Sequence, residues 1–401
     1  MKMANCIKRK ISYGIYILIL MIIMSDKNSV ATDVFGNDEV GRRQSFIHKK
    51  FGPIFGINIF PIANFVGDSH NRQNLWQPGA SYYRNTVLPQ EGVDINKVYK
   101  QLDKLYRENH PDVACHFDNI MVADEPKIPF ITHSIWLTNL DKPVELTDDF
   151  LRWYKQSCKV HLASVGWKHY LWVQDKKKLP KTVREMERAG VEIKEVYSEL
   201  SDEKDFYGLK PCIDQEIAQA KFGRASDILR CVLLYRLGGI YRDVDFEMTR
   251  PFTGLALAYD FFSGIEYPYS CPCNALMASR PTHPIIGKML ELITRNLDPK
   301  TAPPYIEQSL KVGGEELKTL CSTGPITLGV AVKKVILDQG TIAFGLPIID
   351  QPDGHRDRNI VFPPEVFFGD VREKSVGKGP SAFGWHAFKG SWLKKEFGSN
   401  G

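Results

Sequence analysis

The hydrophobic and polar positions after residue 127 follow patterns that are typical of buried strands and amphipathic helices. Residues 128–137 form a nearly continuous apolar run, as expected of a strand that is buried on both faces. Two shorter apolar runs, 169–173 and 191–197, flank a helical segment at 180–190 that begins with proline and ends with glycine. Strand, helix and strand at this spacing predict a βαβ unit, and hence an α/β fold with a mostly parallel sheet.

A single helix is predicted over residues 225–239, with a marked beginning and end. Ser226 can cap its N-terminus, and the acidic Asp227 suits the positive end of the helix dipole. The pair Gly238-Gly239 tolerates the left-handed conformation in which many helices stop. Asp227 and Arg230 are three residues apart, so the sequence places a carboxylate and a guanidinium on one face of this helix.

A short strand, 240–246, is expected directly after the glycines. Its alternation directs Tyr241, Asp243 and Asp245 to one side. Arg242 interrupts the apolar residues on the other side, which predicts a face that is not wholly buried. Carboxylates beside an apolar sheet need partners, because burying an unpaired charge is costly. A hard divalent cation with oxygen ligands, shared with a diphosphate, suits Asp243 and Asp245.

Around these residues the sequence resembles the DXD-containing glycosyltransferases of the GT-A fold, a group that includes clostridial glucosylating toxins and fungal Golgi mannosyltransferases. The resemblance is carried by A-S-D-I-L-R at 225–230 and L-G-G-I-Y-R-D-V-D at 237–245. It implies a Rossmann-like nucleotide-sugar-binding domain with a mostly parallel central sheet, preceded by an irregular, partly helical extension. Further family motifs follow in order over residues 127–393, namely the strand that ends in Trp136 and the segments 274–279, 283–284, 323–325, 362–364 and 386–392.

The resemblance also implies roles for individual residues in binding the nucleotide-sugar. Trp136 would stack on the base of the nucleotide. Asp227 would hold the ribose and nearby sugar hydroxyls, and Arg230 would contact the sugar. Tyr241 would lie near the diphosphate.

The acidic pair and the C-terminal segment complete the implied site. Asp243 would reach the ribose and a metal-bound water, while Asp245 would bind Mn²⁺, or Mg²⁺, directly. Ser391 and Trp392 would close over the metal and the phosphates, with Ser391 as a further metal ligand and His386 as another candidate. The residues expected to take part in catalysis are Asp227, Arg230, Asp243 and Asp245.

Other polar residues are assigned structural roles or left open. His133 is predicted to be a buried strand histidine rather than a general base, and the lone C-x-C at 271–273 to be structural rather than a zinc site. Asn274 and Ser279 either contact the sugar or pack a loop, and both interpretations stay open. Tyr235 is predicted to belong to the core.

Three functions fit these observations. The favoured one is a metal-dependent transfer of a hexose from a nucleotide-sugar to a hydroxyl of a glycan or protein acceptor, with retention of configuration. A UDP-sugar is the favoured donor, and GDP-mannose is the alternative. The competing functions are a nucleotide-sugar hydrolase and a non-catalytic nucleotide-sugar-binding protein. Nucleic-acid binding is disfavoured, because the net charge of +5 falls to +1 without the first 31 residues and no long basic run remains.

The first 31 residues have the pattern of an export signal. Lys8-Arg9-Lys10 precede an uncharged stretch at 11–24, and small residues follow at 29–31. Because a bilayer span needs about 20 apolar residues, this stretch is short for a permanent helix. Either a cleaved signal peptide or a single-pass signal anchor is expected, and with it an exported or secretory-pathway protein. Residues 32–126 are then the extension, with a helix at 96–108, and residues 127–397 the catalytic domain.

Overall fold

A computed structural model describes most of the chain after residue 124 and a short segment before it. All of the described residues belong to the compact unit Pro53–Gly401. The predicted export signal, nearly all of the predicted helix 96–108, and Ser391 and Trp392 lie outside the described residues, so these predictions stay predictions. The described residues are 82–94, 97, 125–161, 165–266, 271–338, 342–344, 357–362, 364–368, 383–387 and 389.

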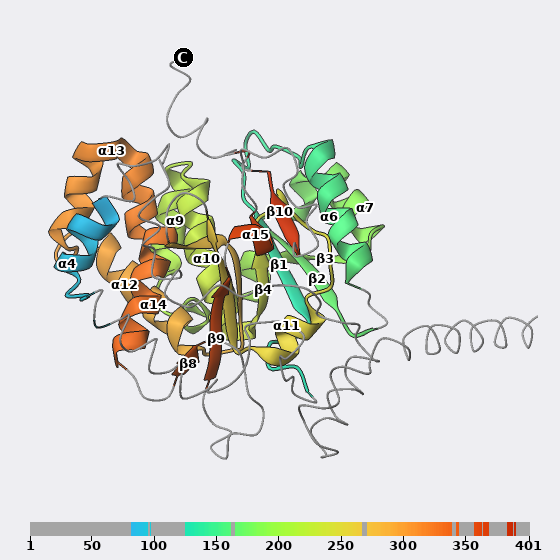
Figure 1. Ribbon diagram of the computed structural model, residues 1–401. Coiled ribbons are helices and arrows are strands. Elements are labelled where there is room, and N and C mark those ends of the chain that lie inside the picture. Colours follow the sequence, from blue (N-terminus) through green and yellow to red (C-terminus); the bar gives the residue numbers. More distant parts are fainter. Residues whose placement is uncertain are drawn as a thin grey trace, which may run out of the picture. The chain divides into compact units, whose positions relative to one another are not determined.

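An eight-stranded sheet with the order β3-β2-β1-β4-β7-β6-β9-β8 forms the centre of this unit (Figure 1). Neighbouring strands are parallel except at β7, which is antiparallel to both β4 and β6. The predicted α/β fold with a mostly parallel sheet is therefore confirmed. The strands are β1 (Ile131–Trp136), β2 (Lys168–Val173), β3 (Val191–Glu195), β4 (Gly239–Arg242), β6 (Phe261–Glu266), β7 (Cys271–Ser279), β8 (Ile342–Phe344) and β9 (Asp357–Phe362), while β5 (Phe246–Met248) and β10 (Gly384–His386) form a separate antiparallel ribbon.

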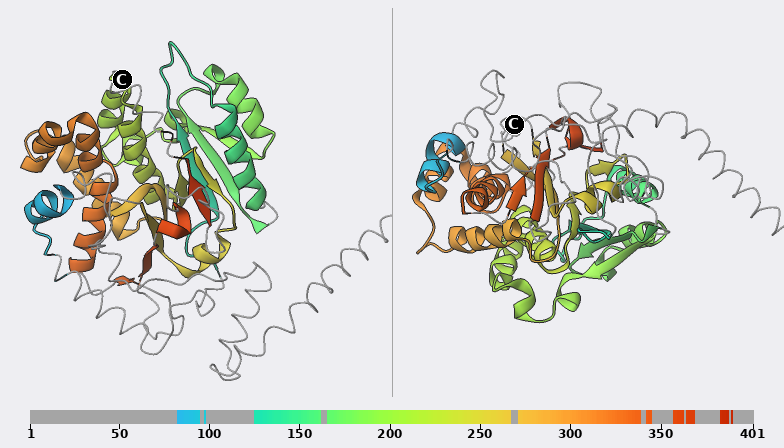
Figure 2. Two further views of the ribbon diagram at one scale, coloured as in Figure 1. Left: turned by 45° about the horizontal axis from the view of Figure 1, so that its top comes forward. Right: turned by 60° about the horizontal axis from the view of Figure 1, so that its bottom comes forward.

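Helices cover both faces of the sheet, as the alternation along β2 illustrates. Leu171 and Val173 pack in one core cluster with α6 and α7, whereas Trp172 packs in the other with α10. Helices α12, α13 and α14 gather at the β7 side of the sheet, away from α6 and α7 (Figure 2). The helices are α6 (Asp148–Val160), α7 (Pro180–Glu187), α10 (Phe222–Leu237), α12 (Pro284–Leu297), α13 (Pro304–Ser322) and α14 (Pro325–Asp338), with short elements η2 (Tyr83–Val87), α4 (Leu88–Gln90), η5 (Lys176–Lys178), α8 (Val196–Glu199), η6 (Glu203–Phe206), α9 (Lys210–Ala218), α11 (Thr253–Ala258) and α15 (Pro364–Phe367).

The helix that carries Asp227 begins earlier than predicted. Helix α10 starts at Phe222, so Ser226 lies inside it and is not its N-cap. The reason is the tight turn before it, where Ala220 adopts a φ of 58° and the Lys221 N–H bonds to the last turn of α9. The predicted end is correct, because α10 ends at Leu237 and Gly238 takes the left-handed φ of 65°.

The predicted strand 240–246 is broken by a turn. Strand β4 ends at Arg242, and the Phe246 N–H donates to the Asp243 carbonyl at 3.0 Å, so Asp243 and Asp245 lie on a turn rather than on one strand face. The prediction of an incompletely buried face at Arg242 is also wrong, because this side chain is 0% exposed. Its guanidinium lies over the ring of Tyr154 and donates to the Phe246 carbonyl, which pulls the chain back on itself.

Part of the predicted extension packs against the helices beside β7. Tyr82 donates its hydroxyl hydrogen to the Tyr305 carbonyl at 2.5 Å, and the buried Glu91 pairs with Arg295 and Lys334. Burial would raise the pKa of Glu91, but these cations outweigh it and the net shift is downward, so the carboxylate stays charged. Among the described residues, no helix has the length and apolar character needed to cross a membrane.

Candidate functional site

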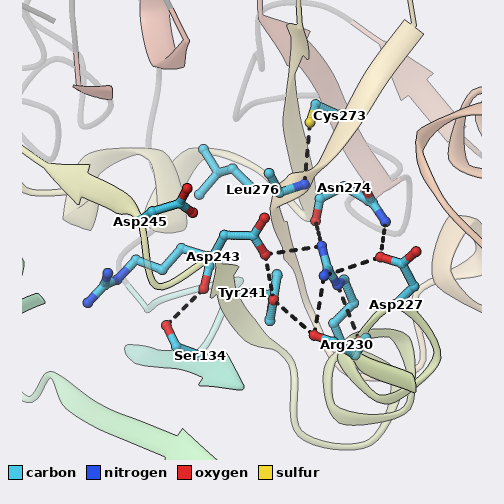
Figure 3. A network of polar contacts seen from close by, with 12 residues as sticks. Ser134, Asp227, Arg230, Tyr241, Asp243, Asp245, Cys273, Asn274 and Leu276 are labelled. Carbon is cyan, nitrogen blue, oxygen red and sulfur yellow. Dashed lines mark hydrogen bonds and ion pairs between the residues drawn. The ribbon is translucent and has the colours of Figure 1, made fainter. Parts of the chain in front are cut away.

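Helix α10 and strand β4 bring two predicted acids onto one arginine (Figure 3). Arg230, only 5% exposed, lies 3.2 Å from Asp227 Oδ1 and 3.3 Å from Asp243 Oδ1. The Tyr241 hydroxyl donates to Asp243 Oδ1 at 2.7 Å, and the guanidinium lies over the Tyr241 ring at 4.3 Å. These four residues therefore form one polar network at the carboxyl end of β4.

The charges in this network support one another in a buried place. Burial raises the pKa of Asp227, and Arg230 opposes that shift. Burial would lower the pKa of Arg230, but Tyr241, Asp243 and Asp227 outweigh it and raise that pKa, so the guanidinium stays charged. A fixed cation between two carboxylates keeps both of them available as hydrogen-bond acceptors.

Two further residues that the sequence did not assign join the network at Asp227. The Asn274 amide donates to Asp227 Oδ1 at 2.8 Å, and its backbone carbonyl accepts from Arg230 at 2.7 Å. The Thr323 hydroxyl donates to Asp227 Oδ2 at 3.0 Å. Of the two interpretations left open for Asn274, the structure shows a side chain that holds an acid of the site.

The turn that carries Asp243 and Asp245, called the acidic turn, and strand β10 bring together a second group of polar side chains beside this network. One ligand atom each from Asp243, Asp245 and His386 lie within 4.8 Å of one another. His386 Nε2 is 3.0 Å from Asp245 Oδ1, and the Lys389 N–H donates to Asp245 Oδ2 at 3.0 Å. Burial would raise the pKa of Asp245, but His386 and the Lys389 N–H outweigh it and the net shift is downward. Two carboxylates and an imidazole fit a divalent cation.

A comparison with known proteins identifies this region. Residues 143–262 match the family described as "Glycosyltransferase sugar-binding region containing DXD motif". The chain carries a DXD-containing glycosyltransferase region. The match includes α10 and the acidic turn, and it agrees with the predicted family. The match ends before Asn274, Thr323 and His386, so only the contacts in the structure assign these three residues to the site.

Curated relatives and solved structures are similar to parts of this glycosyltransferase region. Toxin Afp18 of Yersinia ruckeri is 31% identical over 110 residues, which is 26% of this chain and 5% of that toxin. A toxin of Photorhabdus asymbiotica is 33% identical over 108 residues, covering 26% of this chain and 4% of that toxin. The chain thus spans a small fraction of either toxin.

Two solved structures are similar at lower identity. PaToxG Glycosyltransferase aligns at 21% identity with a TM-score of 0.42, covering 60% of this chain and 76% of that one. The UDP-bound glycosyltransferase domain from the YGT toxin aligns at 12% identity with a TM-score of 0.35, covering 57% and 81% respectively.

Trp136 lies at the carboxyl end of β1, beside the glycosyltransferase motif on β4. Its Nε1 donates to the Val144 carbonyl at 2.7 Å, and its ring meets the edge of Phe150. The ring is half-buried, so part of it faces solvent at the edge where ligands of parallel sheets bind. Ser134 ties the same strand to the acidic turn by donating to the Arg242 carbonyl at 2.8 Å.

The residues given structural roles lie in the core of the described unit. His133 Nε2 donates to the Gly238 carbonyl and Nδ1 accepts from Trp172, while burial lowers the pKa of His133 to about 4. Cys271 and Cys273 are buried in β7. Among the described residues, neither cysteine belongs to a group of three metal-ligating side chains.

Proposed function

We propose that this protein is a metal-dependent glycosyltransferase that moves a hexose from a nucleotide-sugar, with a UDP-sugar favoured over GDP-mannose, to a hydroxyl acceptor. The observation that carries this proposal is the acidic turn beside the Asp227–Arg230 network, within the segment that matches the DXD family. Retention of configuration follows from the resemblance. The acceptor is a glycan or a protein.

The residues of the acidic turn suit a divalent cation, Mn²⁺ or Mg²⁺. Asp243, Asp245 and His386 would hold it, with Ser391 as a further candidate. When bound, such a cation neutralises charge on a leaving diphosphate. Asp245 is suited to this role because its buried carboxylate lies beside Asp243 and His386.

The chain's other residues would bind and orient the donor. Trp136 would stack on the base, where a stacked base is worth about 1–3 kcal/mol. Arg230 would contact the sugar while holding Asp227 and Asp243 in place. Trp392 would exclude water, so that transfer to an acceptor competes with hydrolysis. Export by residues 1–31, as a cleaved signal peptide or an anchor, is part of the same proposal.

Nucleotide release by the full chain tests the proposal. The donors are UDP-glucose, UDP-galactose, UDP-N-acetylglucosamine and GDP-mannose, each with Mn²⁺ and with EDTA. Release from one donor that EDTA abolishes is the expected result. Asp245→Asn should reduce this release by at least about 100-fold, because one charged metal ligand is lost, while Glu203→Gln, a change at an exposed acid, should not. Release that is unaffected by EDTA and by Asp245→Asn would contradict the metal assignment.

A further inference from the structure

The T-G-P segment at 323–325 forms a turn between α13 and α14, and the proposed function assigns it no role. Thr323 follows α13, and Pro325 begins α14. A Cβ atom at Gly324 would lie 3.0 Å from the Leu320 Cα, so glycine allows this turn to pack tightly against the end of α13. The tight turn directs the fully buried Thr323 hydroxyl at Asp227 on α10, 96 residues earlier.

The two carboxylate oxygens of Asp227 differ in how many partners they have. Oδ1 accepts from the Asn274 amide and forms an ion pair with Arg230 Nη2 at 3.2 Å, so two groups already surround this oxygen. Within the described part of the chain, Oδ2 accepts from the Thr323 hydroxyl alone. Asp227 thus retains one acceptor position, on Oδ2.

Donors on both oxygens also fix the plane of this carboxylate. Arg230 lies on the same helix as Asp227 and contacts only Oδ1. By itself this contact would leave the carboxylate free to rotate about its last side-chain bond. Asn274 on β7 and Thr323 after α13 approach from two other elements, and all three side chains are buried. The orientation of the remaining acceptor position is therefore set by Asn274 and Thr323, which are distant from Asp227 in the sequence, and not by α10 itself.

We propose that Thr323 and Asn274 are positioning residues that aim the remaining acceptor position of Asp227 at a hydroxyl of the donor sugar. This inference rests on the proposed function and adds the residues that fix sugar recognition. A hydroxyl of the transferred sugar, rather than of the ribose, would donate its hydrogen to Oδ2, while the base, ribose and diphosphate contacts elsewhere would be unaffected. Loss of the Thr323 hydroxyl should therefore weaken recognition of the sugar but not of the nucleotide.

Thr323→Val in the full chain tests the inference, because it removes the hydroxyl and keeps the shape. We expect kcat/KM for the nucleotide-sugar to fall about tenfold or more, since a buried acceptor loses its partner. Calorimetric affinity for UDP with Mn²⁺ should stay within about twofold of wild type, which corresponds to well under 1 kcal/mol. Thr323→Ser should restore most of the turnover.

The matched control is Thr327→Val. Thr327 is equally buried and donates to the Cys321 carbonyl at 2.9 Å, away from Asp227. Equal effects of Thr323→Val and Thr327→Val, or a parallel loss of UDP affinity, would overturn the inference. If Thr323→Val does not fold, Asn274→Ala provides the same test, because its backbone carbonyl still accepts from Arg230.

Binding separates a failure of this inference from a failure of the proposed function. If wild type releases nucleotide from none of the donors, the proposed transfer fails, and the affinities of the intact nucleotide-sugar and of UDP are compared instead. A preference for the nucleotide-sugar that Thr323→Val removes would still support the positioning role. Equal binding of the two ligands by wild type would overturn it.

Discussion

Arg230 and Arg242 show how one residue type can serve two purposes on either side of the same strand. Both are almost completely buried, at 5% and 0% exposed. Arg230 lies between two carboxylates, whereas Arg242 donates to the Phe246 carbonyl and lies 3.9 Å from the centre of the Tyr154 ring. Arg242 Nε and Nη2 have no hydrogen-bond partner among the described residues.

The difference lies in what each guanidinium holds in place. Arg230 neutralises acids that the proposed reaction uses, so its charge is needed. Arg242 holds the backbone where the acidic turn folds back. Its shape and its hydrogen bond to the Phe246 carbonyl serve this purpose, and its charge does not. Among the described residues Arg242 has no carboxylate partner, and a buried unpaired charge is costly, which implies that Arg242 lowers the stability while it fixes the geometry of the turn.

The largest expected effect comes from Arg230→Met. This change leaves the buried Asp227 and the partly buried Asp243 without their cation, and breaking a buried pair typically costs about 3–5 kcal/mol. We expect nucleotide release to fall at least about 100-fold, a loss equivalent to roughly 3 kcal/mol of barrier, and urea unfolding to shift to lower concentrations. Arg188→Met, at an exposed arginine paired with Glu185, is the control and should change neither. Wild-type release by Arg230→Met would mean that the network is not part of the site.

Acid pH should destabilise the side of the sheet that holds Arg242. Burial, together with nearby Arg242, lowers the pKa of His161 to about 3 and of His169 to about 4, from 6.5. Because the unfolded chain binds these protons more readily, stability is complete above pH 6.5 and is lost as the pH falls towards 4. At about 1.4 kcal/mol per pKa unit, full protonation of one such histidine costs about 3 kcal/mol.

Urea unfolding between about pH 7 and pH 5 measures this loss, because few carboxylates titrate there. Both rings are hydrogen-bonded in the neutral form, with His161 Nε2 accepting from the Phe252 N–H at 2.9 Å. Arg242→Met should make the decline shallower, since one of the causes of the low pKa values is removed. A free energy of unfolding that is constant over this interval would contradict the assignment of these histidines as neutral.

The sequence predicts the surroundings of Arg230 better than those of Arg242. The strands at β1, β2 and β3 and the helix α7 follow from local periodicity, and so does the Asp227–Arg230 spacing on α10. The alternation D-V-D imitates a strand, and the turn becomes evident only from the contact between Arg242 and the Phe246 carbonyl.

The partners that complete the site have no local pattern. Asn274, Thr323 and His386 contact their acids across 47, 96 and 141 residues of sequence. Motif order placed all three segments in the domain, but the pairing of each side chain with a particular acid depends on how α10, β7 and β10 pack together.

Arg242→Met is the smallest expected effect and the sharpest test of the comparison. Methionine keeps a long apolar stem against Tyr154 and removes a buried charge, so we expect the free energy of unfolding to be unchanged or higher. The lost bond to the Phe246 carbonyl should loosen the acidic turn, so release with saturating Mn²⁺ should fall only about fivefold, as expected for one hydrogen bond of about 1 kcal/mol. Urea unfolding and Mn²⁺ titration of the same sample separate the two effects. If Arg242→Met is destabilised as strongly as Arg230→Met, the two guanidinium groups serve the same purpose and Arg242 must have a charged partner.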